Sequence, residues 1–218
     1  MVRVSWLSQV QQERAIAVIR APQIEVGVQM AQSVTAGGME LIEITWNSDR
    51  PADLVQHLRS SLPHCWIGAG TLLTVDDMKA AIEAGAQFLF TPHTNVRLIE
   101  TAVKLEVPIV PGALTPSEIV TAWQAGATCV KVFPIQAVGG ASYIKSLREP
   151  LGQIPLIPTG GVTIDNAPEF IAAGAVAVGL SGQLFPKTAI EQGDWGEIRD
   201  RAARLMKQVV RPEGRGKG

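Results

Sequence analysis

The sequence has few of the residues from which metal sites are usually built. It contains only three histidines (His57, His64, His93) and two cysteines (Cys65, Cys129) in 218 residues. None of these residues shows a CxxC or other metal-ligand spacing. The sequence therefore disfavours a metal-dependent enzyme, and we expect neither a metal nor a separate cofactor.

An excess of charge of one sign is also lacking. The chain has 19 lysines and arginines against 20 aspartates and glutamates. No net field would draw it to nucleic acid or to an anionic membrane, so a small molecule is the expected partner. No uncharged apolar stretch approaches the ~18 residues of a membrane span, and the first residues, MVRVSWLSQVQQER, do not resemble a signal peptide. Because Cys65 and Cys129 lie in apolar runs, as reduced thiols do, we expect a cytoplasmic protein.

Short apolar runs alternate along the chain with alanine-rich segments of helical period. Segments 76–84 and 96–105 are examples of the expected helices. The expected strands number eight, at 15–19, 41–46, 65–70, 88–92, 108–113, 129–134, 155–161 and 175–182. An open doubly wound sheet is the rival fold, but its GxGxxG motif is absent where the first strand runs into IRAPQIE. The pattern predicts a single-domain α/β protein, a (β/α)8 TIM barrel over residues 1–211, with a frayed polar tail at 212–218.

The expected helices carry signals at both ends. The tetrapeptides AGGM, AGAQ, AGAT and AGAV close four of them, and glycine there is typical of a left-handed helix stop. Thr74, Thr115 and Asp165 precede helical segments and are the expected N-caps. The order Thr-Pro-Ser-Glu from Thr115 is that of a capping box.

One lysine lies in the middle of an expected strand. Lys131 stands in ATCVKVFPI, in the register that turns Cys129, Lys131 and Phe133 into the barrel, and the other lysines fall on helices, loops or the tail. Glu43, in LIEIT, faces inward at a similar depth. The two could form a buried ion pair that only fixes the packing. Alternatively, burial disfavours the ammonium form and leaves an amine able to attack a carbonyl and form a Schiff base, with Glu43 moving protons. Both interpretations predict that Lys131 and Glu43 are neighbours.

Further polar and glycine residues fall at the ends of expected strands. Thr71 ends the GAGT segment with little side-chain bulk beside it. Gly160 and Gly161 follow the seventh strand, and Ser181 lies in a glycine-rich segment after the eighth. Barrel enzymes commonly bind phosphate at these two positions, so we expect an anion site there.

In order and spacing, the motifs resemble those of one family, the class I 2-keto-3-deoxy-6-phosphogluconate (KDPG) aldolases, which are often also active on 4-hydroxy-2-oxoglutarate (KHG). The resemblance covers nearly all of residues 10–210. It rests on LIEIT, GAGT, Thr91-Pro92, VKVFP, PTGG and the late glycine-serine loop.

The resemblance implies a pyruvate-forming lyase that assembles as a homotrimer and acts on a 2-oxo acid, expected to be phosphorylated. Lys131 would form the Schiff base and Glu43 would be the acid and base. The expected substrate-binding residues are Thr71, Pro92 and Phe133 at the pyruvate site, Gly160, Gly161 and Ser181 at the phosphate, and Asn47 and Thr159 as markers of the substrate.

The two substrate markers disagree. Gluconate-type members typically carry arginine where this chain has Asn47, which resembles relatives acting on the galactonate epimer, whereas Thr159 matches the gluconate type. We therefore expect a relaxed preference at C4 and weaker binding of the substrate carboxylate. Alternatives are an aldolase for the galactonate epimer, an oxaloacetate decarboxylase, a phosphate-binding isomerase or synthase without an imine, and a sugar-phosphate sensor.

Overall fold

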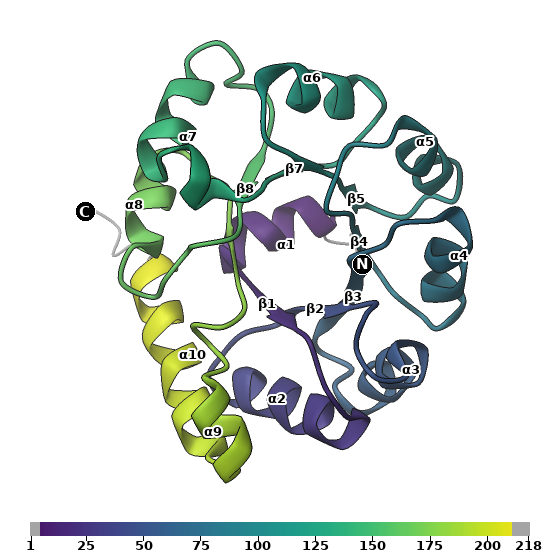
Figure 1. The fold of residues 1–218 in the computed structure, drawn as a ribbon, viewed down its shortest axis with the longest axis vertical. Coiled ribbons are helices and arrows are strands. Elements are labelled where there is room, and N and C mark those ends of the chain that lie inside the picture. The colour runs from purple at the N-terminus through teal and green to yellow at the C-terminus, as the bar shows by residue number, and fades with distance from the viewer. Residues whose placement is uncertain (1–4, 211–218) are drawn as a thin grey trace, which may run out of the picture.

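The computed structural model describes residues 5–210. Parallel strands curve around a common axis in this part of the chain (Figure 1). Their bounds are β1 (Ala15–Ile19), β2 (Leu41–Thr45), β3 (Trp66–Gly70), β4 (Leu89–Phe90), β5 (Ile109–Val110), β6 (Gly112–Ala113), β7 (Val130–Val132), β8 (Leu156–Pro158) and β9 (Val178–Leu180). Because β5 and β6 are the two halves of one run interrupted at Pro111, the nine labelled strands fill eight positions in the barrel.

Hydrogen bonds close the strands into a barrel. One sheet has the order β5-β4-β3-β2-β1-β9 and the other the order β6-β7-β8. The run from β5 to β6 belongs to both sheets, and a bridge between Thr159 and Gly179 joins β8 to β9. The predicted single-domain α/β barrel is thus confirmed, with strands shorter than the apolar runs that predicted them.

Helices surround the barrel (Figure 1). Their bounds are α2 (Ile24–Ala36), α3 (Pro51–Ser61), α4 (Val75–Glu83), α5 (Val96–Lys104), α6 (Pro116–Gln124), α7 (Ala141–Arg148), α8 (Ala167–Ala172), α9 (Lys187–Gln192) and α10 (Trp195–Val209), with a 3-10 helix, η1 (Ile135–Val138), after β7. Val130 and Val132 pack in the layer between strands and helices, whereas Cys129 packs inside the barrel with Leu41. This alternation confirms the predicted inward register of both strands.

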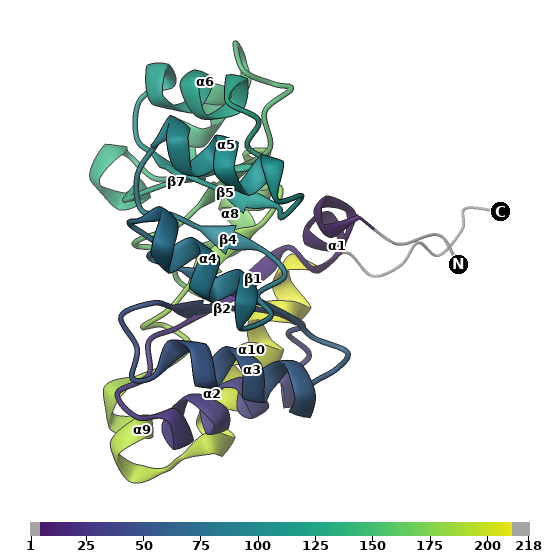
Figure 2. The same cartoon turned by 90° about the vertical axis from the view of Figure 1, so that its right-hand side faces the viewer.

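A further helix, α1 (Trp6–Glu13), was not predicted from the sequence. It lies across one end of the barrel and projects from the ring of helices (Figure 2). The Trp6 ring packs 5.1 Å from the ring of Phe88 and 6.4 Å from that of Phe90, measured between centroids. Because α1 covers the N-terminal ends of the strands, the barrel interior is open only toward the C-terminal ends.

Most of the predicted helix ends are confirmed. Thr74 and Thr115 each cap a helix through a capping box. The four predicted helix-stop segments each contain a glycine with φ between 91° and 101°, namely Gly38, Gly85, Gly126 and Gly174. The prediction for Asp165 is wrong, because the cap position is Asn166 and the Asp165 carboxylate instead accepts a hydrogen bond from Arg204 on α10.

Two further expectations concern the C-terminal tail and membrane-spanning helices. The predicted tail, residues 212–218, lies outside the described residues, so the boundary at 211 stays a prediction. Within residues 5–210, none of the helices combines the length and the apolar character needed to cross a bilayer.

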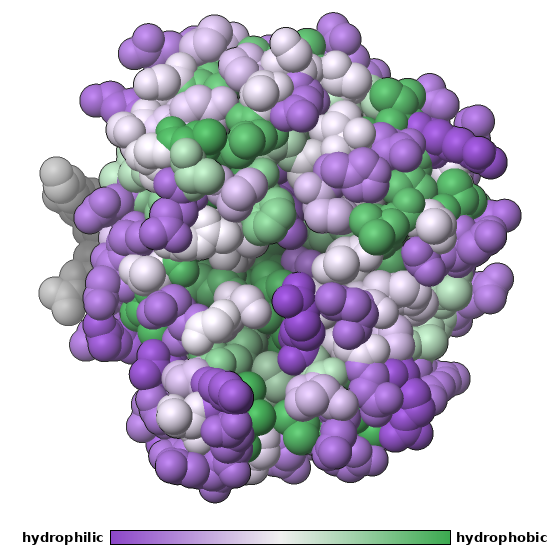
Figure 3. Space-filling model, in the orientation of Figure 1, coloured by the Kyte–Doolittle hydropathy of each residue, from purple (hydrophilic) through white to green (hydrophobic). Residues whose placement is uncertain are grey.

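The face of the molecule viewed in Figure 3 is hollowed near its centre.

Candidate active site

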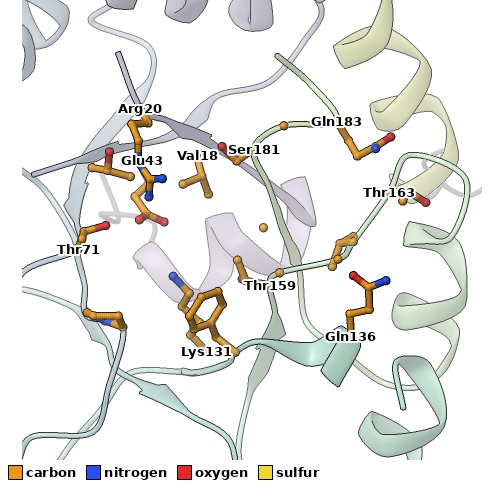
Figure 4. A pocket seen from close by; sticks show the side chains of 18 residues that line it. Val18, Arg20, Glu43, Thr71, Lys131, Gln136, Thr159, Thr163, Ser181 and Gln183 are labelled. Carbon is orange, nitrogen blue, oxygen red and sulfur yellow. The ribbon is translucent and has the colours of Figure 1, made fainter. Parts of the chain in front are cut away.

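A cavity of about 590 Å³ opens at the C-terminal ends of the strands. Nine of the ten residues predicted for the site line it: Glu43, Thr71, Pro92, Lys131, Phe133, Thr159, Gly160, Gly161 and Ser181. They come from strands and loops spread over the whole chain, and barrel closure brings them together (Figure 4). Asn47 is the exception, since it does not line the cavity.

Lys131 projects into the cavity from the middle of β7. Its side chain is only 7% exposed, and its backbone N–H donates to the carbonyl of Pro111 at 2.9 Å. The Nζ atom lies 4.9 Å from the centre of the Phe133 ring and 5.8 Å from that of Phe90. Aromatic faces stabilise a cation at these distances without neutralising it. The amine is therefore held at the base of the cavity by an aromatic wall.

Glu43 reaches the cavity from β2 and is 1% exposed. Space for its carboxylate comes from Gly70 on β3, where an added Cβ would lie 1.8 Å from Oε1 of Glu43. No described group forms a hydrogen bond with Oε1. Burial raises the pKa of Glu43, and the charges of Lys131 and Arg20 offset part of that rise. A carboxyl group with a raised pKa holds a proton more readily than a free carboxyl group does, which suits a general acid and base.

Lys131 and Glu43 point into the same cavity from different strands (Figure 4). This arrangement confirms that the two residues are neighbours. No salt bridge joins them, however, so the interpretation as a buried ion pair is wrong. The amine is not neutralised by direct contact with the carboxylate, and the cavity lies open to both groups. This arrangement suits an amine that must bond to another molecule.

Thr71 lies directly after β3 in a strained backbone conformation. Its φ is +60°, in the left-handed region, which costs a threonine about 1–3 kcal/mol. Such strain is found where a function depends on the position of a side chain. Pro92 follows the neighbouring strand β4, and both residues line the cavity.

The other end of the cavity is formed by the segments that follow β8 and β9. Gly160 and Gly161 have φ of +83° and +93°, and a Cβ on Gly161 would lie 2.3 Å from Cβ of Gln136. The N–H groups of both glycines donate to no acceptor among the described residues. Ser181 and Thr159 add hydroxyl groups. This end therefore offers neutral donors to an anion.

The sequence did not reveal several residues at this glycine-rich end. Gln136, Thr163 and Gln183 also line the cavity, with their side chains gathered there in Figure 4. Thr163 and Gln183 follow expected strands closely, and the rule that strand ends form the site could have identified them. Gln136 lies on η1, for which the sequence carried no signal.

Arg20 is a further residue that the sequence analysis did not identify. It directly follows β1, lines the cavity and donates a hydrogen bond from Nε to Oδ1 of Asn47 at 3.2 Å. Asn47 thus contacts the site through Arg20. A charged residue immediately after the first expected strand was the available signal, because that position belongs to the mouth of a barrel.

The acidic residues, histidines and cysteines of the described chain form no metal-binding cluster. Within residues 5–210 no three histidine, cysteine, aspartate or glutamate side chains gather in a way that could hold a metal ion. Burial inside the barrel raises the pKa of Cys129 to about 12, so its thiol stays neutral. Cys129 therefore packs as a small apolar residue, as predicted from the sequence.

A closed barrel with a buried amine and a buried carboxyl group facing one cavity is the arrangement expected of a Schiff-base aldolase. The chain belongs to the family described as KDPG and KHG aldolase, whose model matches residues 7–201. The KDPG aldolase of Haemophilus influenzae is 33% identical over 181 residues, which are 83% of this chain and 84% of that protein. The KHG/KDPG aldolase of Escherichia coli K12 is 30% identical, over 89% and 90% of the two chains.

A solved structure resembles the fold closely. The KDPG aldolase of Legionella pneumophila, with pyruvate captured at low pH as a covalent carbinolamine intermediate, superposes with a TM-score of 0.86. It is 26% identical, over 93% of this chain and 98% of that one. These comparisons confirm the family predicted from the sequence, and with it an enzyme that breaks carbon–carbon bonds.

Replacing Glu43 by glutamine should stabilise the protein and impair catalysis. Because burial raises the pKa of Glu43 in the folded chain above its ordinary value of 4.5, ionising the group costs stability. The ordinary value of 4.5 is that of the unfolded chain, and below it the cost is absent. The cost grows as the pH rises from that value to the pKa of the folded chain, and it stays at its full size above that. We expect Glu43→Gln to raise the melting temperature more at pH 8 than at pH 4.5, and to lower kcat about 10²–10⁴-fold.

Thermal unfolding at the two pH values and steady-state kinetics test this expectation. Glu100→Gln is the control, because Glu100 is exposed on α5 and should change neither quantity. An equal effect of Glu43→Gln on the melting temperature at both pH values would contradict the raised pKa.

Proposed function

We propose that this chain is a class I aldolase that cleaves KDPG to pyruvate and glyceraldehyde 3-phosphate, and KHG to pyruvate and glyoxylate. The observation that carries the proposal is the arrangement of Lys131 and Glu43, which are both buried and face one cavity without a salt bridge. No feature of the site favours an isomerase, a decarboxylase or a sensor over this activity.

The first half of the reaction uses the amine. Lys131, as free base, adds to the C2 ketone of the substrate, and loss of water from the resulting carbinolamine gives an iminium ion. The positive nitrogen then accepts the electron pair released when the bond between C3 and C4 breaks. The aromatic wall of Phe90 and Phe133 tolerates this charge while keeping bulk water away.

The second half of the reaction uses the carboxyl group. Glu43, ionised, takes the proton of the C4 hydroxyl, so that the aldehyde leaves and an enamine of pyruvate remains on Lys131. Glu43 can then return the proton to C3 of the enamine. Addition of water to the regenerated iminium ion releases pyruvate and the amine. These reaction steps need no cofactor, because the iminium ion formed on Lys131 accepts the electron pair.

The glycine-rich end of the cavity would hold the part of the substrate distant from C2. The unpaired N–H groups of Gly160 and Gly161 and the hydroxyl of Ser181 suit a phosphate or a second carboxylate. Thr159 lies between this end and Lys131. Because the donors are neutral, either anion can be accommodated there.

A homotrimer in the cytoplasm is part of the same proposal. Exposed apolar side chains support an interface between copies, with Leu73 56% and Val96 42% exposed beside the mouth of the barrel. The free thiols of Cys65 and Cys129 suit a reducing compartment.

The trimer can be tested by light scattering. The measurement should give three times the chain mass, and the mass of one chain would contradict the trimer.

Reductive trapping with pyruvate tests the imine directly. We expect borohydride in the presence of pyruvate to fix the adduct on Lys131, located by peptide mass mapping, with a matching loss of activity. Lys131→Met should abolish trapping. Lys145→Met, which alters an exposed lysine of α7, should leave it unchanged. An adduct on another lysine, or none, would replace the aldolase with an isomerase or synthase of the same fold.

The preference between the two C4 epimers tests the substrate. Asn47 and Thr159 point to different epimers, so we expect values of kcat/KM for the gluconate and galactonate substrates within about 100-fold of each other, which is about 2.7 kcal/mol. Steady-state assays with both purified substrates measure this ratio. A larger preference would show that one marker alone decides the stereochemistry.

A further inference from the structure

Two loops form the glycine-rich end of the cavity, and the first of them holds its own shape. This loop, residues 159–166, follows β8. Asn166 accepts a hydrogen bond at Oδ1 from the N–H of Thr163 at 2.7 Å, and its Nδ2 donates to the carbonyl of Gly161 at 3.3 Å. The glycines of this loop are therefore positioned by side chains of the loop itself.

The second loop, residues 181–186, follows β9 and has less internal support. The N–H groups of Leu184 and Phe185 donate to the carbonyl of Ser181 at 2.9 and 3.1 Å, and both apolar side chains are buried. The tip of the loop is exposed instead, and its residues Ser181, Gly182 and Gln183 line the cavity (Figure 4). A group outside the loop is needed to fix this tip.

Arg201 on α10 is in contact with that tip. Its Nη1 donates to the backbone carbonyl of Gln183 at 3.1 Å, and no other described group donates to this carbonyl. Helix α10 runs beside α8 and α9 on the outside of the barrel (Figure 1). None of the described residues that line the cavity belongs to α10. Arg201 therefore reaches the site only through the loop.

Glu197 fixes the direction in which the guanidinium of Arg201 points. Nε and Nη2 of Arg201 donate to Oε1 of Glu197 at 2.9 and 2.7 Å, from one turn further along α10. The two side chains are only 34% and 39% exposed. Because the guanidinium is planar, these two bonds set the direction of the remaining nitrogen, Nη1, which contacts the loop.

A second arginine of α10 contacts the first loop but holds it less firmly. Arg204 donates to the carboxylate of Asp165. The two side chains are 58% and 76% exposed, and ion pairs this exposed contribute little. Since residues 159–166 are also held by Asn166, we expect the loop after β9 to depend on α10 more than the loop after β8 does.

We propose that Arg201 is a positioning residue that holds the loop 181–186 in the conformation that binds the distal anion of the substrate, and that Glu197 orients Arg201. A loop that is free to move must be ordered each time a ligand binds, and the backbone freedom lost then weakens binding. The proposal rests on the aldolase function. It assigns to α10 a role in the affinity for the whole substrate and none in the imine chemistry.

A comparison of two ligands separates this role from a structural one. The cleaved substrate reaches the glycine-rich end, whereas pyruvate ends at C3. For Arg201→Met we expect the KM of the substrate to rise about 10-fold, the effect of losing a hydrogen bond to a charged group, with kcat changed less than about 2-fold. The pyruvate concentration that gives half-maximal trapping by cyanoborohydride should also change less than about 2-fold. A variant that only lost stability would show less active enzyme and an unchanged KM.

The assay uses whichever of KDPG and KHG the parent chain cleaves faster, and α10 itself offers the controls. Arg199→Met is the matched control, because among the described residues Arg199 pairs only with its neighbour Asp200. Arg204→Met should raise KM less than Arg201→Met does. Glu197→Ala should also give a smaller rise. Adding it to Arg201→Met should have no further effect, because Glu197 acts through Arg201.

The possible failures are distinguishable. If the parent chain is trapped by pyruvate and cleaves its substrate, but Arg201→Met matches Arg199→Met in KM or weakens pyruvate to the same extent, the role of Arg201 is refuted and the aldolase function stands. If Arg201→Met does not fold, Glu197→Ala decides, and an unchanged KM for the substrate refutes the role. If the parent chain is not trapped by pyruvate at all, the aldolase function fails and the role of Arg201 fails with it.

Discussion

The structure depends on keeping an amine and a carboxyl group buried together without letting them pair. Isolated ionisable groups are costly to bury, and a direct ion pair would be the simplest way to offset that cost. Here Lys131 is stabilised by aromatic faces, and Glu43 keeps an oxygen without a hydrogen-bond partner. The surrounding packing must supply the stability that this pair does not. Both groups consequently remain reactive.

Several features of the barrel follow from that constraint. Gly70 has no side chain because the carboxylate of Glu43 occupies the space, and Gly68 has none because the ring of Phe88 does. Phe88 in turn packs on Trp6 of α1, which covers the opposite end of the barrel. The glycines of β3 therefore serve two functions at once, one at the reactive end of the barrel and one in its apolar base.

The sequence predicted the barrel and most of its site because both leave local signals. Eight apolar runs reveal eight strands, and a lysine inside such a run is conspicuous wherever it occurs. Helix α1 left no comparable signal in the sequence. The packing role of Trp6 becomes visible only in the folded chain, through its ring contacts with Phe88 and Phe90. Asp165 was misassigned because Asn166 takes the cap position and exchanges hydrogen bonds with Thr163, while the Asp165 carboxylate accepts from Arg204 on another helix.

Arg20 illustrates a different limit of sequence reasoning. A charge after a strand is common on protein surfaces, and only the hydrogen bond to Asn47 and the direction of the side chain distinguish this one. Once it is placed, the two ends of the cavity differ in kind. The catalytic end holds the three ionisable side chains Arg20, Lys131 and Glu43. The distal end has neutral donors only, and it lacks the bidentate guanidinium that gives geometric specificity for one anion. A distal end that offers neutral donors suits the family described as KDPG and KHG aldolase, whose two substrates carry different anions there.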